Sequence, residues 1–233
     1  MLKTLSALLA AVAIATATTV HAAGPQVGEH NQVQPLPING MVAAVKNGKL
    51  AFVSSNGRFV FQGTVYDTWN KKDVTTIAEA KFANEYLDLE KLKFKVDELA
   101  PMVVGKGEKE VVVFYDPYCP SCHQLIEDIE GLDGYTFKFV AIPVMGNDSS
   151  KAVRFAFCSP DKEMAKKVLL GQVKPSSLPS DKFETCDTGP LAKRVISSQL
   201  FGLVGVPFLV RDDGLVRHGY QKGDIANWLE AGK

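Results

Sequence analysis

Two cysteines separated by two residues stand between a β-forming run and a helical pattern, and this arrangement constrains the fold more than any other part of the chain. The run Glu110–Tyr115 is rich in β-branched and aromatic residues, which is typical of a buried central strand. The motif Cys119-Pro120-Ser121-Cys122 follows, and Pro120 suits the first helical position, where its missing N–H costs nothing. The pattern predicts a strand, a dithiol at a helix start and a helix.

The place of each cysteine on this helix predicts its chemical role. Cys122 lies on the apolar stripe of the helix, so we expect its side chain to face inward. We expect Cys119 to be exposed at the helix N-terminus, where unpaired N–H groups and the helix dipole favour a thiolate. Cys119 is therefore predicted to attack and Cys122 to resolve.

Three further residues of the motif are candidates for tuning the dithiol: Pro120, Ser121 and His123. A protonated His123 would stabilise a nearby thiolate. A solvated histidine in the first helical turn explains the same residue equally well, so both interpretations of His123 stand.

The other two cysteines, Cys158 and Cys186, are predicted to form a structural disulfide, because they remain once the first pair is assigned. A zinc site is disfavoured, since they do not form a second C-x-x-C pair and no two histidines have ligand spacing. The remaining alternatives are a purely structural disulfide in the first motif and a second redox-active pair at Cys158 and Cys186. No metal or other cofactor is predicted.

A proline far downstream is a candidate for the substrate site. Gly205-Val206-Pro207 precedes an apolar run, where a trans proline at the start of a strand would be ordinary. Downstream of a strand–dithiol–helix unit we expect a cis bond instead. It would present the backbone of Val206 to an extended substrate beside the dithiol.

The first 22 residues predict export. Lys3 precedes the apolar segment 5–20, and small residues at Val20 and Ala22 mark cleavage after Ala22. A membrane anchor is disfavoured, because the segment is short and lacks a positive stop-transfer flank. The mature protein is expected in an oxidising compartment. The 26 basic and 26 acidic residues balance, so no nucleic-acid partner is indicated.

The mature chain divides into three parts by pattern. Residues 23–74 predict a flexible start and a small β-meander, with strands at 41–45, 49–53 and 58–66. Asn47-Gly48 marks a hairpin, and the third strand has a candidate break at Gly63. Such a meander buries little surface alone, which favours dimerisation. Residues 75–100 predict a stiff helical linker of one or two helices, with Thr76 as N-cap.

Residues 101–233 predict an α/β domain. After the dithiol helix, which extends to Leu132, the expected elements are a strand at 136–142, helices at 148–157, 160–170 and 189–201, strands at 206–210 and 215–220, and a helix at 223–229. The predicted fold class is thus a small α+β N-terminal domain, a helical linker and an α/β domain.

These motifs resemble a known family. The strand–Cys119-Pro120-Ser121-Cys122-His123–helix unit followed by Gly205-Val206-Pro207 resembles the thioredoxin superfamily. The whole mature chain is similar to the bacterial periplasmic disulfide isomerases of the DsbC/DsbG type, through segments 50–53, 58–67, 114–119 and 219–221. The resemblance implies a thioredoxin-like domain with inserted helices and a V-shaped homodimer with an apolar cleft. It also implies exported client proteins and a membrane reductase of the DsbD type, and it places a structural disulfide at Cys158 and Cys186.

Two features depart from the pattern of these isomerases, and a third residue differs from thioredoxin itself. Pro120-Ser121 replaces the Gly-Tyr of the best-known isomerase, and Val206 stands where these isomerases usually have threonine. Val113 stands where thioredoxin carries a buried aspartate, which disfavours the role of a cytosolic reductase. We predict isomerisation of non-native disulfides. The alternatives are reduction of sulfenylated single cysteines, oxidation of dithiols, and a holdase chaperone that uses the apolar cleft.

Overall fold

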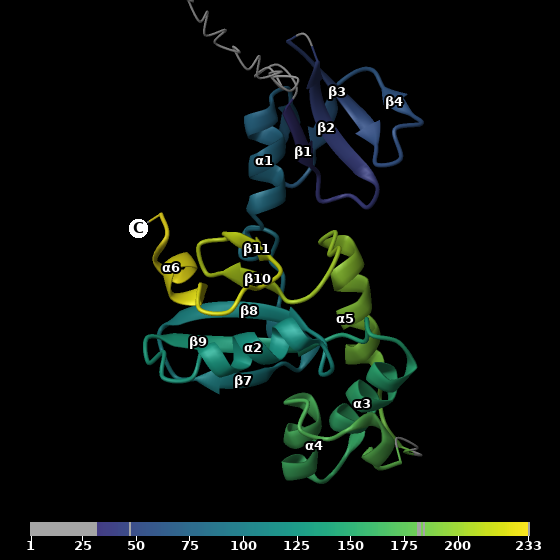
Figure 1. Cartoon of the computed structure of the whole chain (residues 1–233), viewed down its shortest axis with the longest axis vertical. Coiled ribbons are helices and arrows are strands. Elements are labelled where there is room, and N and C mark those ends of the chain that lie inside the picture. Colours follow the sequence, from purple (N-terminus) through teal and green to yellow (C-terminus); the bar gives the residue numbers. More distant parts are fainter. Residues whose placement is uncertain (1–31, 47, 181–182, 184, 233) are drawn as a thin grey trace, which may run out of the picture.

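The structure, a computed structural model, describes residues 32–46, 48–180, 183 and 185–232 (Figure 1). The predicted signal segment 1–22 and its cleavage site at Ala22 lie outside the described residues, as do residues 23–31 and Asn47. Within the described ranges, no helix combines the length and apolarity that spanning a membrane requires.

The N-terminal domain is a four-stranded antiparallel sheet in the order β1-β2-β3-β4. The strands are β1 (Gln32–Pro35), β2 (Met41–Lys46), β3 (Lys49–Ser54) and β4 (Val60–Phe61). Lys46 pairs with Lys49, so the predicted hairpin is confirmed on either side of the predicted turn. β1 was not predicted, because its polar sequence indicated a flexible start. It forms because Gln32–Pro35 pairs with Val42–Val45 of β2.

The predicted third strand divides at Gly63, so the candidate break there is confirmed, and only β4 and the segment 65–67 are strands. This glycine has φ +135°, and the chain leaves the first sheet there. β5 (Val65–Asp67) pairs instead with β6 (Lys72–Val74), a strand that was not predicted. Val74 is buried with Phe52 and Ala80 in the small core of this domain.

The predicted linker helix is confirmed only in its first part. α1 (Ile77–Glu85) begins at Thr76, whose side chain accepts from the Glu79 N–H, while the Glu79 carboxylate accepts from the Thr76 N–H. The helix ends at Glu85, so the prediction of helix through residue 100 is wrong apart from the 3₁₀ turn η1 (Val96–Leu99). Leu87 and Leu99 are buried against the second domain, and this burial overrides helix propensity.

The second domain is a five-stranded sheet in the order β11-β10-β8-β9-β7. Central β8 (Lys109–Tyr115) runs parallel to β9 (Tyr135–Ala141) and antiparallel to β10 (Phe208–Arg211). The edges are β7 (Met102–Gly105), which was not predicted, and β11 (Val216–His218). Val113 is fully buried at the centre of β8, as its apolar run predicts.

Helices cover this sheet and extend beyond it (Figure 1). The helices are α2 (Pro120–Asp128), α3 (Asn147–Cys158), α4 (Lys162–Leu169), α5 (Gly189–Leu200) and α6 (Ile225–Glu230), with a 3₁₀ turn η2 (Pro175–Ser177). One core contains both cysteines of the dithiol together with Leu125 of α2 and Leu229 of α6. The opposite core contains Phe114 and Phe208 of the sheet, covered by Phe201 and the segment 87–99. The inserted α3 and α4 pack on each other at the lower right of Figure 1.

The two domains contact each other closely. The Trp69 ring lies edge-on to the Phe201 ring, with centroids 6.1 Å apart. The Leu87 N–H donates to the Gly214 carbonyl at 2.8 Å. Gly202 approaches so near that a Cβ there would lie 2.3 Å from the Pro37 carbonyl oxygen. The first domain therefore packs directly against the second.

Candidate active site: the Cys119–Cys122 dithiol

The dithiol lies where β8 ends and α2 begins. Cys119 is the N-cap of α2, and Pro120 occupies the first turn, as predicted. The Cys119 carbonyl accepts from the N–H groups of Cys122, at 3.0 Å, and of His123, at 3.2 Å. The first turn of the helix is therefore formed around the dithiol itself. Both cysteines are free thiols in this structure.

The prediction that Cys119 is exposed is wrong. Only 6% of its surface is accessible, because the chain at Val206 lies over it. Its thiol donates to the Val206 carbonyl oxygen across 3.6 Å. The sequence could not show this cover, since 87 residues separate the two positions.

The Val206–Pro207 peptide bond is cis, as predicted. Pro207 is buried and its carbonyl accepts from the Gly219 N–H at 2.8 Å, which ties this loop to the residue after β11. Val206 is half-buried, and its carbonyl oxygen faces the sulfur of Cys119. The predicted substrate-side residues and the dithiol are thus brought together.

Cys122 faces inward, as predicted, and is 1% exposed. Burial raises the pKa of the Cys122 thiol well above its ordinary value, and a hydrogen bond with Cys119 acts in the same direction. Cys122 therefore stays protonated at neutral pH. This fits a sulfur that is held back until the first exchange step has occurred.

His123 is engaged by the chain rather than free in solvent. Its ring Nε2 lies 2.5 Å from the Pro117 carbonyl oxygen, so this nitrogen carries the proton in that contact. Gly171, with φ +67°, packs against the ring, and a Cβ there would lie 2.1 Å from Nε2. Sequence reasoning missed Gly171, because no local signal connects this glycine, two residues after α4, to the dithiol. Tuning of the dithiol by His123, Pro120 or Ser121 stays a prediction.

Large apolar side chains are exposed on segments next to the dithiol. Val204 lies two residues before Val206 and is 71% exposed. Val144 and Met145 follow β9, whose end lies beside the end of β8, and both are about half exposed. Such side chains suit contact with unfolded or extended polypeptide.

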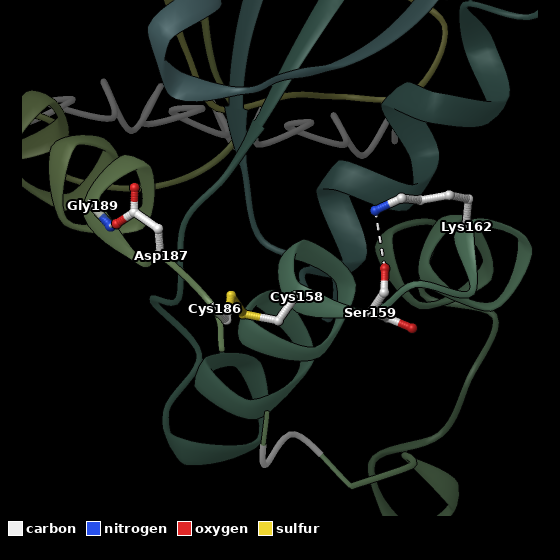
Figure 2. The surroundings of a disulfide bond; sticks show 6 residues. All are labelled: Cys158, Ser159, Lys162, Cys186, Asp187 and Gly189. Carbon is white, nitrogen blue, oxygen red and sulfur yellow. Dashed lines mark hydrogen bonds between the residues drawn. A yellow bond between two sulfur atoms is a disulfide. The ribbon is translucent and has the colours of Figure 1, made fainter. Parts of the chain in front are cut away.

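The expected disulfide joins Cys158, at the end of α3, to Cys186, in the loop before α5 (Figure 2). The two Cα atoms are 5.6 Å apart, within the ordinary range for a disulfide. Figure 2 also shows the Lys162 ammonium donating to the Ser159 carbonyl at 3.0 Å, beside the bridge. Because both sulfurs are bonded to each other, they cannot serve as zinc ligands with the dithiol. Among the described residues, no three His, Cys, Asp or Glu side chains form a metal-binding group.

A strand, a C-x-x-C helix start and a cis-proline loop at the same end of the sheet define a thiol–disulfide oxidoreductase of the thioredoxin type. Comparison with known proteins supports this class. Residues 96–233 match the model of a thioredoxin-like domain, and residues 9–76 match that of the disulfide bond isomerase N-terminal domain. The chain therefore belongs to the thioredoxin-like family, and within it to the thiol:disulfide interchange proteins of the DsbC type.

Individual relatives span most of the chain. The thiol:disulfide interchange protein DsbC of Escherichia coli strain K12 is 29% identical over 200 residues, which cover 82% of this chain and 77% of that protein. DsbC of Salmonella typhimurium is 27% identical over 231 residues, which cover 95% of this chain and 90% of that protein. A solved disulfide interchange protein from Neisseria gonorrhoeae aligns at 23% identity with a TM-score of 0.47, over 58% of this chain and 94% of that one.

Proposed function

We propose that this protein isomerises non-native disulfides in exported proteins through a mixed disulfide at Cys119. The observation that supports this most directly is the Val206 carbonyl 3.6 Å from the Cys119 sulfur. An extended client strand that hydrogen-bonds to this backbone would bring its own disulfide against the attacking sulfur. Positioning of this kind supplies much of the rate of an exchange reaction.

The proposed cycle conserves electrons until a client stalls. The Cys119 thiolate attacks one sulfur of a client disulfide, forming the mixed disulfide and releasing the second client sulfur as a thiolate. That thiolate attacks another client disulfide. A client thiolate then attacks the mixed disulfide at the client sulfur, forms a new client disulfide and releases the Cys119 thiolate. The client is rearranged without net oxidation.

Cys122 provides the exit from a stalled complex. After losing its proton, it attacks the Cys119 sulfur, forms the enzyme disulfide and releases the client sulfur, which takes up a proton. The client has then gained two electrons and the enzyme has lost them. A thiol reductant must restore the dithiol, and we propose a membrane reductase of the DsbD type for this step.

The test is recovery of activity by scrambled ribonuclease in a glutathione buffer. We expect the intact protein to speed recovery, and the Cys119→Ala variant to give only the recovery of the glutathione buffer alone. Equal recovery with both proteins would contradict the proposal. The reduction potential of the Cys119–Cys122 pair then separates isomerisation from the oxidase alternative, because a dithiol oxidant has a markedly higher potential. Reactivity toward a sulfenylated client tests the sulfenic-acid reductase alternative.

Homodimerisation and periplasmic location are parts of the same proposal. The match of residues 9–76 to an isomerase N-terminal domain supports both, and the exposure of Phe59, Val60 and Phe61 on that domain supports the dimer. A second copy covering these side chains would remove apolar surface from water. Sedimentation of the mature chain tests the dimer, and fractionation of expressing cells tests the location.

A holdase activity is the second candidate, favoured by one observation. Ile196 and Leu200 of α5 are 62% and 55% exposed, and with Val204 they extend the apolar surface away from the sulfurs. If this surface binds clients independently of exchange, Cys119→Ala will still suppress aggregation of a reduced, unfolded client. Loss of suppression in that variant would argue against holdase activity.

A further inference from the structure

A buried carboxylate that takes no part in the proposed exchange lies three residues before Cys119. Asp116 is 0% exposed, at the end of β8. Its Oδ1 accepts from the Tyr118 N–H and from the Ser149 hydroxyl, both at 2.8 Å. Its Oδ2 accepts from the N–H groups of Val144, at 2.8 Å, and Met145, at 2.9 Å. Four donors therefore satisfy this group completely.

These contacts join three separate segments. The bond to Tyr118 closes the turn that leads into the dithiol, and the Cys119 N–H donates to the Asp116 carbonyl at 3.1 Å across the same turn. The bonds to Val144 and Met145 hold the loop that carries two exposed apolar side chains. The Ser149 bond adds the first turn of α3. One carboxylate thus fixes the attacking sulfur relative to the apolar loop.

The charge of this carboxylate is not balanced by a cation. All four of its donors are neutral, and no basic side chain among the described residues forms an ion pair with Asp116. A buried anion without a counter-ion acts strongly on neighbouring groups, because little water screens it. Its effect on a nearby thiol is to oppose ionisation.

We propose that Asp116 is a positioning residue for disulfide exchange, which fixes the Cys119 turn to the Val144–Met145 loop and, through its unbalanced charge, holds the dithiol toward the reducing side. This inference rests on the proposed function. The reduced dithiol is stabilised when one of its sulfurs is a thiolate. An anion that disfavours the thiolate therefore destabilises the reduced form and makes the couple more reducing. For Cys122, burial and the hydrogen bond with Cys119 are the larger causes of the raised pKa. A hydrogen bond with the Asp116 backbone acts against them, and the Asp116 charge is the smallest of the causes that raise this pKa.

The variant Asp116→Asn separates this role from simple packing. The side chain keeps its shape, but an amide NH₂ must face either the Val144 and Met145 donors or the Tyr118 and Ser149 donors. One anchor is therefore lost together with the charge. Ser149→Ala is the first control, since it removes one donor and keeps the charge and three backbone bonds. Ser197→Ala is the second, since it removes a buried hydrogen bond to the Lys193 carbonyl, at 2.7 Å, on α5.

The measurement is the equilibrium of each protein with reduced and oxidised glutathione. We expect Asp116→Asn to shift the equilibrium constant about tenfold toward the dithiol, which corresponds to about 30 mV in potential. Ser149→Ala should stay within about threefold of the parent protein, and Ser197→Ala should not differ from it. A potential unchanged in Asp116→Asn would overturn the inference. If the parent protein itself does not equilibrate with glutathione, the proposed function fails instead.

A measurement on the parent protein keeps the inference testable even if the variant does not fold. The amide hydrogens of Tyr118, Val144 and Met145 all point at Asp116, so we expect them to exchange as slowly as those in β8 and β9. Fast exchange at these three loop positions would show that the carboxylate does not hold the two segments, and the positioning role would be abandoned.

Discussion

The sulfur of Cys119 lies 3.6 Å from the carbonyl oxygen of Val206, although 87 residues separate the two positions in the chain. The contact connects the start of α2 to the cis-proline loop before β10. A client strand must therefore displace this cover, or pair with it, before its disulfide reaches the sulfur. The predictions below follow from this arrangement and from the groups that support it.

Replacing each cysteine of the dithiol separately should give opposite results with a disulfide-containing client. Cys122→Ala removes the resolving sulfur, so we expect the mixed disulfide at Cys119 to accumulate, as seen on a non-reducing gel. Cys119→Ala should give no adduct, because Cys122 is 1% exposed. An adduct formed by Cys119→Ala would show that the roles are reversed.

Alkylation should distinguish the two thiols, because burial raises the pKa of the Cys122 thiol. Iodoacetamide at pH 8 should modify one cysteine in the folded, reduced protein and both in urea. Mass spectrometry of the digested protein identifies the modified residue, which we expect to be Cys119. Comparable labelling of Cys122 in the folded state would contradict the prediction that Cys119 is the more reactive thiol.

The same raised pKa predicts how stability depends on pH. In the unfolded chain the Cys122 thiol ionises near its ordinary value of 9.0, whereas in the folded protein it remains protonated to higher pH. Its contribution is therefore fully present below about pH 9 and is lost as pH rises further, by up to about 1.4 kcal/mol per pH unit. Urea unfolding of the reduced protein between pH 7 and 10 measures this loss. The slope should be smaller in Cys122→Ala.

Removing the bridge between Cys158 and Cys186 should affect stability and leave exchange chemistry intact. The bond closes a separation of 28 residues, and its loss should cost about 3–4 kcal/mol in the free energy of unfolding in the chain-entropy model. We expect the double alanine variant to show this in urea, with the alkylation rate of Cys119 unchanged. A fall in that rate would indicate that the bridge also supports the dithiol.

Gly171 offers a test of the contact beneath the dithiol. In Gly171→Ala the new Cβ would meet the His123 ring and the Pro117 carbonyl at a backbone φ of +67°. We expect the free energy of unfolding, measured in urea, to fall by about 2–4 kcal/mol, from backbone strain and overpacking together. Gly57→Ala is a matched control, with φ +70° and no atom within 4 Å of the new Cβ. The control should lose only about 1 kcal/mol in the free energy of unfolding. Equal losses in the two variants would contradict the close contact of Gly171 with the His123 ring.

Local sequence signals predicted the dithiol unit well, because its determinants lie close together in the chain. Each part has its own physical reason. The β-branched run before Cys119 favours a strand, Pro120 favours a helix start, and the apolar position of Cys122 favours burial. The burial of Cys119 could not be predicted in this way. It depends on Val206, which reaches the sulfur only after the whole sheet has formed.

The errors in the fold have a similar origin. The segment after Glu85 carries leucines and a phenylalanine at spacings that also fit a helix. Its true partner is the face of the sheet that contains Phe114 and Phe208, where Leu87 and Leu99 are buried. Edge strands β1 and β7 were missed because pairing with a neighbour, rather than apolar alternation, determines them. Tertiary contacts decided the structure at each of these positions.

The early end of α1 has a mechanical consequence. Tyr86 bridges to Leu215 and Leu87 bonds to Gly214 directly after the helix, so no free hinge separates the two domains there. The same hairpin is bonded to the cis-proline loop, because the Gly219 N–H donates to the Pro207 carbonyl. A continuous series of backbone contacts therefore connects the end of α1 to the loop that touches the reactive sulfur.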